Sequence, residues 1–128
     1  MMYLFLLGRV LLGGYFIMSG MNHFLNLGML TGYAQSKGVS MPREMVLLTG
    51  LMMTLGGLGV LLGIYIEFSV LLLSIFLVAV TFVMHRYWEI SDPMAKMGEM
   101  VNFKKNLGLL GAVLMLLAIP TPWVLSLW

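Results

Sequence analysis

The side chains of this sequence that could do chemistry are few, and most stand at the ends of long apolar runs. The candidates for binding a ligand are two histidines with amide and basic residues near them: Asn22, His23, His85, Arg86, Lys105 and Asn106. Histidine can carry a proton or bind a metal, and amide and basic side chains can hydrogen-bond a lipophilic molecule. None of these residues specifies a reaction, so whether the protein is an enzyme stays open.

Metal chemistry is disfavoured by the number and the position of these side chains. A haem held by His23 and His85 would lie within the bundle, whereas both histidines stand at its rim. Zinc would need a third protein ligand, which Glu89 or Asp92 would have to supply. The chain has no cysteine, and its 14 methionines are dispersed without regular spacing. We therefore expect no metal site.

The composition is that of an integral membrane protein. Of the 128 residues, 61% are hydrophobic and 9% are charged, which lies far outside the range of soluble domains. The net charge of +2 is too small to suggest nucleic acid as a partner. The lipid bilayer is thus the expected partner of most of the surface.

Four apolar segments are long enough to cross a bilayer as helices, and they predict an all-α transmembrane bundle. The spans are expected at about 3–24, 42–62, 67–88 and 103–119, in a single domain of residues 1–128. The segment from Leu27 to Met41 is too polar to span and predicts a short interfacial helix, ended by Gly38 in a left-handed conformation. Residues 90–101 are expected to form a water-facing loop, with Asn102 as the N-cap of the fourth span.

An antiparallel arrangement of these spans brings the candidate ligand-binding residues to one face of the membrane. The two loops on that face carry six basic residues and the opposite face carries only Arg9, which predicts that both termini lie outside. The same rule offers a plain explanation for Lys104 and Lys105, as topology signals, and for Arg86. Asn22 and Asn106 could equally tie helices together through hydrogen bonds.

The third span predicts different roles for two neighbouring residues. Ser74, Thr81 and His85 follow spacings of seven and four, which place them on one helical face. Arg86 is turned by about 100° from His85. We therefore expect His85 to face the bundle and Arg86 to reach toward lipid headgroups or Glu89.

At the opposite end of the bundle, two charged residues and two tryptophans stand near the membrane surface. Arg9 and Glu67 are candidates for a structural ion pair between the first and third spans. Trp123 and Trp128 follow the last span, where tryptophan commonly anchors a chain in the interface.

Several stretches resemble the DoxX family of small membrane proteins. GYFIMSGMNHF at 14–24 is similar to the family's first-helix signature, and YAQSKGVSMP at 33–42 to its interfacial segment. The paired glycines at 56–57, the stretch HRYW at 85–88 and NFKKNLGLLG at 102–111 follow in the family's order. Many members carry a glutamate a few residues before the paired glycines, where this chain has Met53.

The resemblance implies a four-helix protein of a bacterial or archaeal cytoplasmic membrane. It also implies an accessory subunit of a quinone-linked or sulfur-linked redox system, with a quinone or similar lipophile bound near His23 and His85. The alternative is a non-catalytic subunit that assists the assembly of a partner protein. The expected protein partner is a membrane or cytoplasmic redox protein, or a second copy of the chain.

Overall fold

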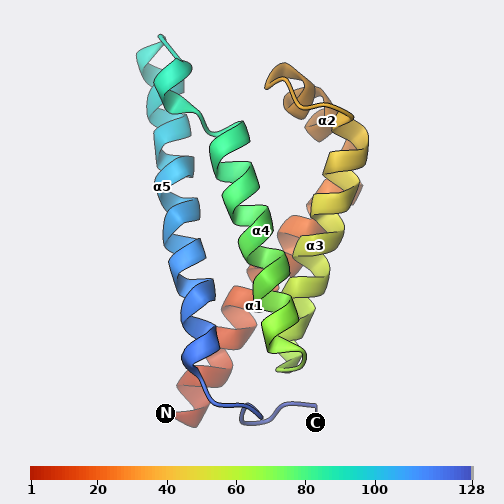
Figure 1. The fold of residues 1–128 in the computed structure, drawn as a ribbon, viewed down its shortest axis with the longest axis vertical. Coiled ribbons are helices and arrows are strands. Elements are labelled where there is room, and N and C mark those ends of the chain that lie inside the picture. Colours follow the sequence, from red (N-terminus) through yellow and green to blue (C-terminus); the bar gives the residue numbers. More distant parts are fainter. Residues whose placement is uncertain (128) are drawn as a thin grey trace.

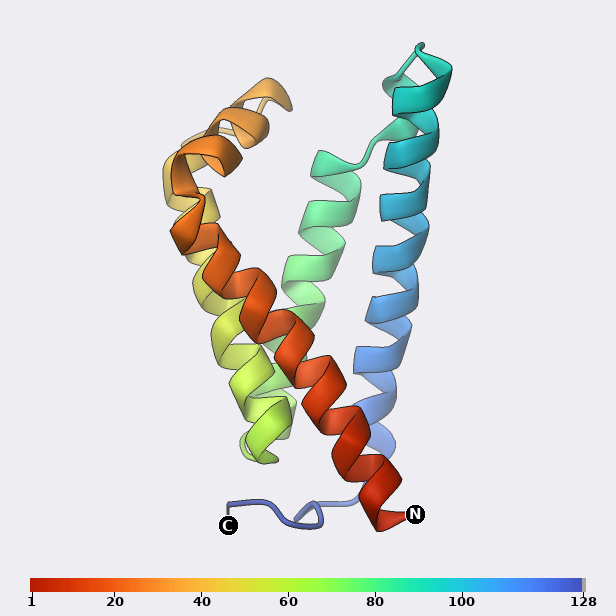
Figure 2. The ribbon, with the colours of Figure 1, turned by 180° about the vertical axis from the view of Figure 1, so that it is seen from behind.

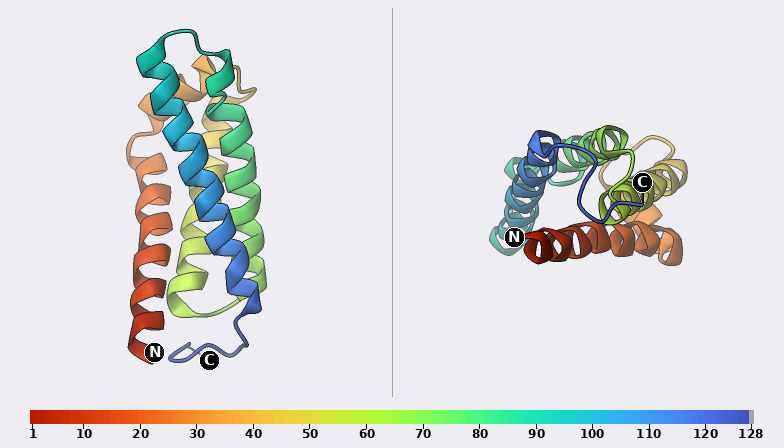
Figure 3. Two further views of the ribbon diagram at one scale, coloured as in Figure 1. Left: turned by 90° about the vertical axis from the view of Figure 1, so that its left-hand side faces the viewer. Right: turned by 90° about the horizontal axis from the view of Figure 1, so that it is seen from below.

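The computed structural model describes residues 1–127, and these form a bundle of helices without strands (Figure 1). In chain order the elements are α1 (Met2–Leu25), α2 (Leu27–Ser36), α3 (Pro42–Leu62), α4 (Ile66–Met84), η1 (Tyr87–Glu89), α5 (Pro93–Met115) and η2 (Leu116–Ala118). Helices α1, α3, α4 and α5 are long and apolar enough to cross a membrane. Both termini lie at one end of the bundle, and α2 lies at the other (Figures 1 and 3).

The short helix between the first two spans forms as predicted. It covers Leu27–Ser36, and Gly38 follows it with a φ of 80°. A left-handed conformation costs glycine little because it has no Cβ, so Gly38 can end the helix and turn the chain toward α3. Helix α3 begins at Pro42, where proline's missing N–H is harmless in a first turn.

The third predicted span, 67–88, matches a segment at Ile66–Glu89 that is long enough to cross a membrane, whereas the start predicted for the fourth span was wrong. Helix α4 ends at Met84, before the aromatic residues that follow it. Helix α5 begins at Pro93 rather than near Asn102, so the expected loop is reduced to a few residues. Asp92 is the reason, because its carboxylate accepts a hydrogen bond from the backbone N–H of Ala95 at 2.9 Å and caps the helix.

Helices α1 and α3 are held together most closely, through glycines that face each other. A Cβ atom added to Gly13 would lie 2.8 Å from the carbonyl oxygen of Gly57, and one added to Gly57 would meet Gly13 at the same distance. About two turns further along, Gly20 of α1 and Gly50 of α3 face each other in the same way. Backbones can approach this closely only where side chains are absent.

The four long helices pack in the order α1, α3, α4, α5, and the chief contacts of α5 are with α4. Fully buried side chains of α1, α3 and α4 form the core, among them Phe16, Val60, Leu73 and Leu77. Helices α1 and α5 make few or no direct contacts, and in Figure 2 their axes diverge toward the end with α2. The bundle is consequently less closely packed between α1 and α5.

Arg9 is buried, with 3% of its surface exposed, and it does not form the expected ion pair with Glu67. Its guanidinium instead donates to backbone carbonyl oxygens: Val60 at 3.3 Å, Leu61 at 2.8 Å, Val124 at 2.5 Å and Leu125 at 3.5 Å. The first two carbonyls belong to the last turn of α3, where a helix has unpaired acceptors and a partial negative charge. Glu67 lies exposed at the start of α4.

Trp123 does not extend into the membrane interface as an exposed anchor. It is buried, its ring meets that of Phe5 edge-on at 5.2 Å, and the guanidinium of Arg9 lies 5.7 Å from its centroid. The segment after α5 therefore folds back under α1 and α3. Trp128 lies outside the described residues.

Candidate functional site

A cavity of about 480 Å³ lies between α1, α4 and α5, on the side where α1 and α5 diverge. Five of the six candidate ligand-binding residues line it: Asn22, His23, His85, Lys105 and Asn106. The rest of its wall is largely apolar, with Phe16, Phe76 and Leu77 from the core. Met53 of α3 also lines it.

Asn106 is the most unusual residue of the wall. Its exposed fraction is 7%, and its amide, which stays open to the cavity, forms no hydrogen bond with any residue of the described chain. An amide that becomes fully buried normally needs a partner, because leaving it without one costs about 1–3 kcal/mol. Since Asn106 borders the cavity, a molecule in the cavity could supply that partner.

His23 is held by its own helix. Its Nδ1 atom lies 2.8 Å from the carbonyl oxygen of Ser19, one turn earlier in α1. A carbonyl can only accept, so Nδ1 carries the proton in this contact. The other ring nitrogen, Nε2, has no hydrogen-bond partner within residues 1–127.

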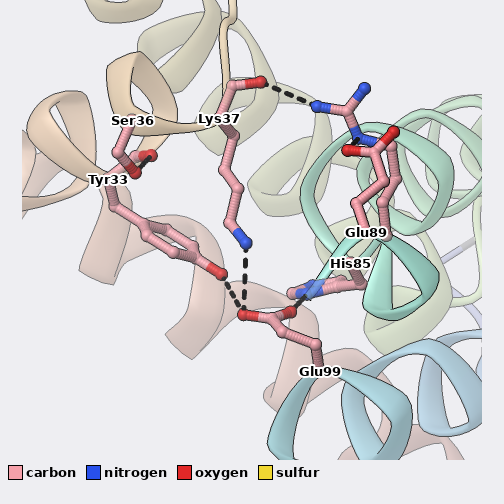
Figure 4. A network of polar contacts seen from close by, with 7 residues as sticks. Tyr33, Ser36, Lys37, His85, Glu89 and Glu99 are labelled. Atoms are coloured by element: carbon pink, nitrogen blue, oxygen red, sulfur yellow. Dashed lines mark hydrogen bonds and ion pairs between the residues drawn. The ribbon is translucent and has the colours of Figure 1, made fainter. Parts of the chain in front are cut away.

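His85 belongs to a polar network that is centred on Glu99 and joins three parts of the chain (Figure 4). Its Nδ1 atom lies 2.5 Å from Oε2 of Glu99 in α5. The other oxygen of Glu99 accepts a hydrogen bond of 2.7 Å from the Tyr33 hydroxyl in α2 and lies 3.7 Å from the ammonium of Lys37. Helices α2, α4 and α5 are thus connected at the end of the cavity by one carboxylate.

The Tyr33 hydroxyl donates a hydrogen bond in this network and keeps its proton. Burial, with a further contribution from the hydrogen bond to Glu99 and its negative charge, raises the pKa of the Tyr33 hydroxyl. The hydroxyl therefore stays protonated, and the carboxylate of Glu99 is the acceptor.

Arg86 does not line the cavity, unlike the other five candidates. Its Nη2 atom donates to the carbonyl oxygen of Lys37 at 3.0 Å, and its Nε atom lies 3.5 Å from Oε2 of Glu89. The expected separation of roles is therefore found: His85 faces the bundle and Arg86 turns to Glu89. The helix does not continue to Glu89, however, because α4 ends at Met84 and the contact forms within the short helix that follows.

The sequence analysis missed Glu99, because it placed this residue in a water-facing loop. Two signals could have found it. Asp92 followed by Pro93 is a common helix start. Glu99 and Asn106 are also seven residues apart, which is two helical turns and places them on one face.

A second cavity, of about 270 Å³, lies on the other side of the two histidines, between α2, α3 and α4. Most of its lining is aliphatic, with Leu30, Val46 and Val83 among the lining residues. Both cavities are lined by His23, Phe76, Val80 and His85. The imidazoles therefore stand where a polar cavity meets an apolar one.

No group of three histidine, aspartate or glutamate side chains in residues 1–127 is placed to hold a metal ion. The polar groups around the two cavities are suited to hydrogen bonding, because they combine imidazole nitrogens, amides and one ammonium.

Comparison with known families identifies the chain. The model of the DoxX family matches residues 4–86, which is well over half of the 128-residue chain. The chain belongs to the DoxX family. No curated protein and no solved structure is similar enough to count as a match. The DoxX match ends before α5, so Glu99, Lys105 and Asn106 lie beyond it. With four helices that can cross a bilayer, this DoxX protein is an integral membrane protein.

Proposed function

We propose that this DoxX protein binds a lipophilic molecule with a polar head, a quinone in the first instance, in the cavity between α1 and α5. It would do so as an accessory subunit of a quinone-linked or sulfur-linked redox system. The observation that carries the proposal is the amide of Asn106, which faces the cavity and has no hydrogen-bond partner in the described chain.

The surroundings of Asn106 fit such a ligand. The amide of Asn22 and the ammonium of Lys105 reach the same cavity and can donate to a carbonyl or hydroxyl oxygen. The remaining wall is apolar, as binding sites for lipophiles commonly are, and its volume is within the range of small-molecule sites.

The decisive variant is Asn106→Leu, which replaces the amide by an apolar group of similar size. Without ligand, we expect its melting temperature in detergent to be close to that of the wild type, because the change removes no hydrogen bond within the protein. Addition of decyl-benzoquinone should raise the melting temperature of the wild type and not that of the variant. Asn102→Leu, on the same helix but away from the cavity, should retain the stabilisation.

Two outcomes would overturn the proposal. One is a wild-type protein that decyl-benzoquinone does not stabilise and that purifies without any bound lipophile. The other is equal stabilisation of the wild type and Asn106→Leu, which would place the binding outside this cavity.

A second candidate function, a subunit that assists the assembly of a partner, is favoured by the exposure of α5. Only Asn106 and Val113 of this helix are buried, and Gly98, Gly108 and Gly111 have open space in front of them. Small residues on a membrane helix allow close approach by another helix. This function predicts a stoichiometric protein partner after purification in mild detergent, and its loss in Gly108→Leu.

A further inference from the structure

Both histidines at the junction of the two cavities use their Nδ1 atoms as donors within the protein. His23 donates to the carbonyl oxygen of Ser19 at 2.8 Å, and His85 donates to the carboxylate of Glu99 at 2.5 Å. Neither a carbonyl nor a carboxylate can donate in return, so the proton position on each ring is decided by its partner. In the neutral imidazole the other nitrogen, Nε2, then carries a lone pair and can only accept.

Neither Nε2 atom has a hydrogen-bond partner in the part of the chain that the structure describes, although both imidazoles border the two cavities. The donors of the wall come from other residues, namely the amides of Asn22 and Asn106 and the ammonium of Lys105. The amide oxygen of Asn22 already accepts a hydrogen bond from Asn26, which leaves its N–H groups to face a ligand. With neutral imidazoles, the site therefore offers acceptors from the histidines and donors from the remaining polar residues.

From this arrangement we infer that the cavity selects a lipophile whose head carries a hydroxyl group, such as a quinol or another phenol, over the corresponding carbonyl compound. A hydroxyl group donates its proton to Nε2 and accepts a hydrogen bond from an amide with its oxygen. A carbonyl oxygen accepts from the amide but meets the Nε2 lone pair with a lone pair of its own. The inference rests on the proposed function and adds the chemical form of the ligand.

The apolar cavity below α2 supplies the place for the rest of such a molecule. It shares His23, Phe76, Val80 and His85 with the polar cavity, so a head group at the histidines can continue directly into it. Its volume of about 270 Å³ suits an alkyl or isoprenoid chain rather than a second head group, because its wall is mainly aliphatic.

The test compares decyl-benzoquinol with decyl-benzoquinone, because the two differ only in the groups that the histidines would distinguish. Binding to the detergent-solubilised protein is measured by equilibrium titration at pH 8 without oxygen. We expect the quinol to bind about tenfold more tightly or better, because a buried acceptor without a partner costs about 1–3 kcal/mol. His23→Phe keeps the ring shape and removes the acceptor, so it should reduce the preference to about threefold or less. Met21→Leu, on the same helix and facing outward, should keep the full preference.

The outcomes separate this inference from the proposed function. If both forms bind equally, or the quinone binds more tightly, the selection for a hydroxyl group is wrong while binding in the cavity stands. If neither form binds, both the inference and the proposed function are wrong. A single sharp peak in size-exclusion chromatography and an unchanged helical circular-dichroism spectrum must accompany each variant. If His23→Phe fails this control, His85→Phe takes its place in the comparison, with the same reduction expected.

Discussion

The Nδ1 atom of His85 and the Oε2 atom of Glu99 lie 2.5 Å apart, and their contact joins the end of α4 to the first turns of α5. The same carboxylate reaches Tyr33 in α2 and Lys37 just after it. Side chains of Glu99 and His85 are mostly buried, with exposed fractions of 15% and 12%. One acidic group therefore fixes both the relative position of three helices and the orientation of an imidazole at the cavity.

Glu99→Gln should destabilise the protein. Glutamine keeps the shape of the side chain but loses the charge that holds Lys37, and it weakens the hydrogen bonds from His85 and Tyr33. We expect the free energy of unfolding to fall by about 1–3 kcal/mol, measured by denaturant titration in mild detergent. Glu89→Gln removes the more exposed contact with Arg86 and should change stability by less than about 1 kcal/mol. Equal effects of the two changes would contradict the role of Glu99.

The Tyr33 hydroxyl should make the protein sensitive to alkaline pH. Its pKa is raised in the folded protein by burial and by Glu99, so the unfolded chain releases this proton first as the pH rises. The contribution of Tyr33 to stability is complete below the pKa of an unfolded tyrosine, about 10, and declines above it. Melting temperatures at pH 8 to 11 should fall less steeply for Tyr33→Phe than for the wild type. Tyr3→Phe, at an exposed position, should follow the wild-type curve.

Gly13→Ala should disturb the crossing of α1 and α3, and its neighbour Gly14→Ala should not. The new methyl group at 13 would meet the backbone of Gly57 and Leu61 at 2.8 and 2.9 Å, whereas nothing lies within 4 Å at 14. Overpacking of this kind typically costs about 1–3 kcal/mol. The change at 14 meets open space and exerts only the helix propensity of alanine, which is favourable by up to about 1 kcal/mol. Thermal unfolding of the two variants side by side provides the measurement.

Arg9 should contribute to stability through the carbonyl oxygens that it binds. Arg9→Met leaves buried acceptors of α3 and of the C-terminal segment without a donor, and we expect a loss of about 2–5 kcal/mol. Arg9→Lys keeps the charge but not the forked geometry, so its loss should be intermediate. Arg43→Ala, at an exposed position, is the matched control and should have little effect. Rescue of Arg9→Met by a hydrophobic change at Glu67 would contradict this view, because the structure does not pair the two residues.

The orientation in the membrane is testable because the chain has no cysteine of its own. The distribution of basic residues predicts that α2 and the start of α5 face the cytoplasm. In intact cells Lys96→Cys should not react with a maleimide that cannot cross membranes, and Glu67→Cys at the opposite end should react. Labelling of Lys96→Cys from outside would reverse the predicted topology.

Much of this fold follows from local sequence alone. The long apolar runs predict the membrane-spanning helices, because a chain in hydrocarbon must form its backbone hydrogen bonds internally. Gly38 and Pro42 predict the end of the short helix and the start of α3, because each favours the backbone conformation needed there. The same reasoning predicted that His85 faces inward. Its limits appear at residues 90–101, where polar composition suggested a loop although Asp92 caps a helix there.

The tertiary structure decided the partners of the charged and polar groups. Arg9 binds carbonyl oxygens of α3 and of the C-terminal segment rather than Glu67, because the chain folds back under α1 after α5. Glu99 meets His85 and Tyr33 only because α2 and α5 come together at one end of the bundle. Apolar periodicity indicates which residues are buried away from water. The atom that each buried polar group finds there depends on how the helices cross, and no local pattern in the sequence encodes that crossing.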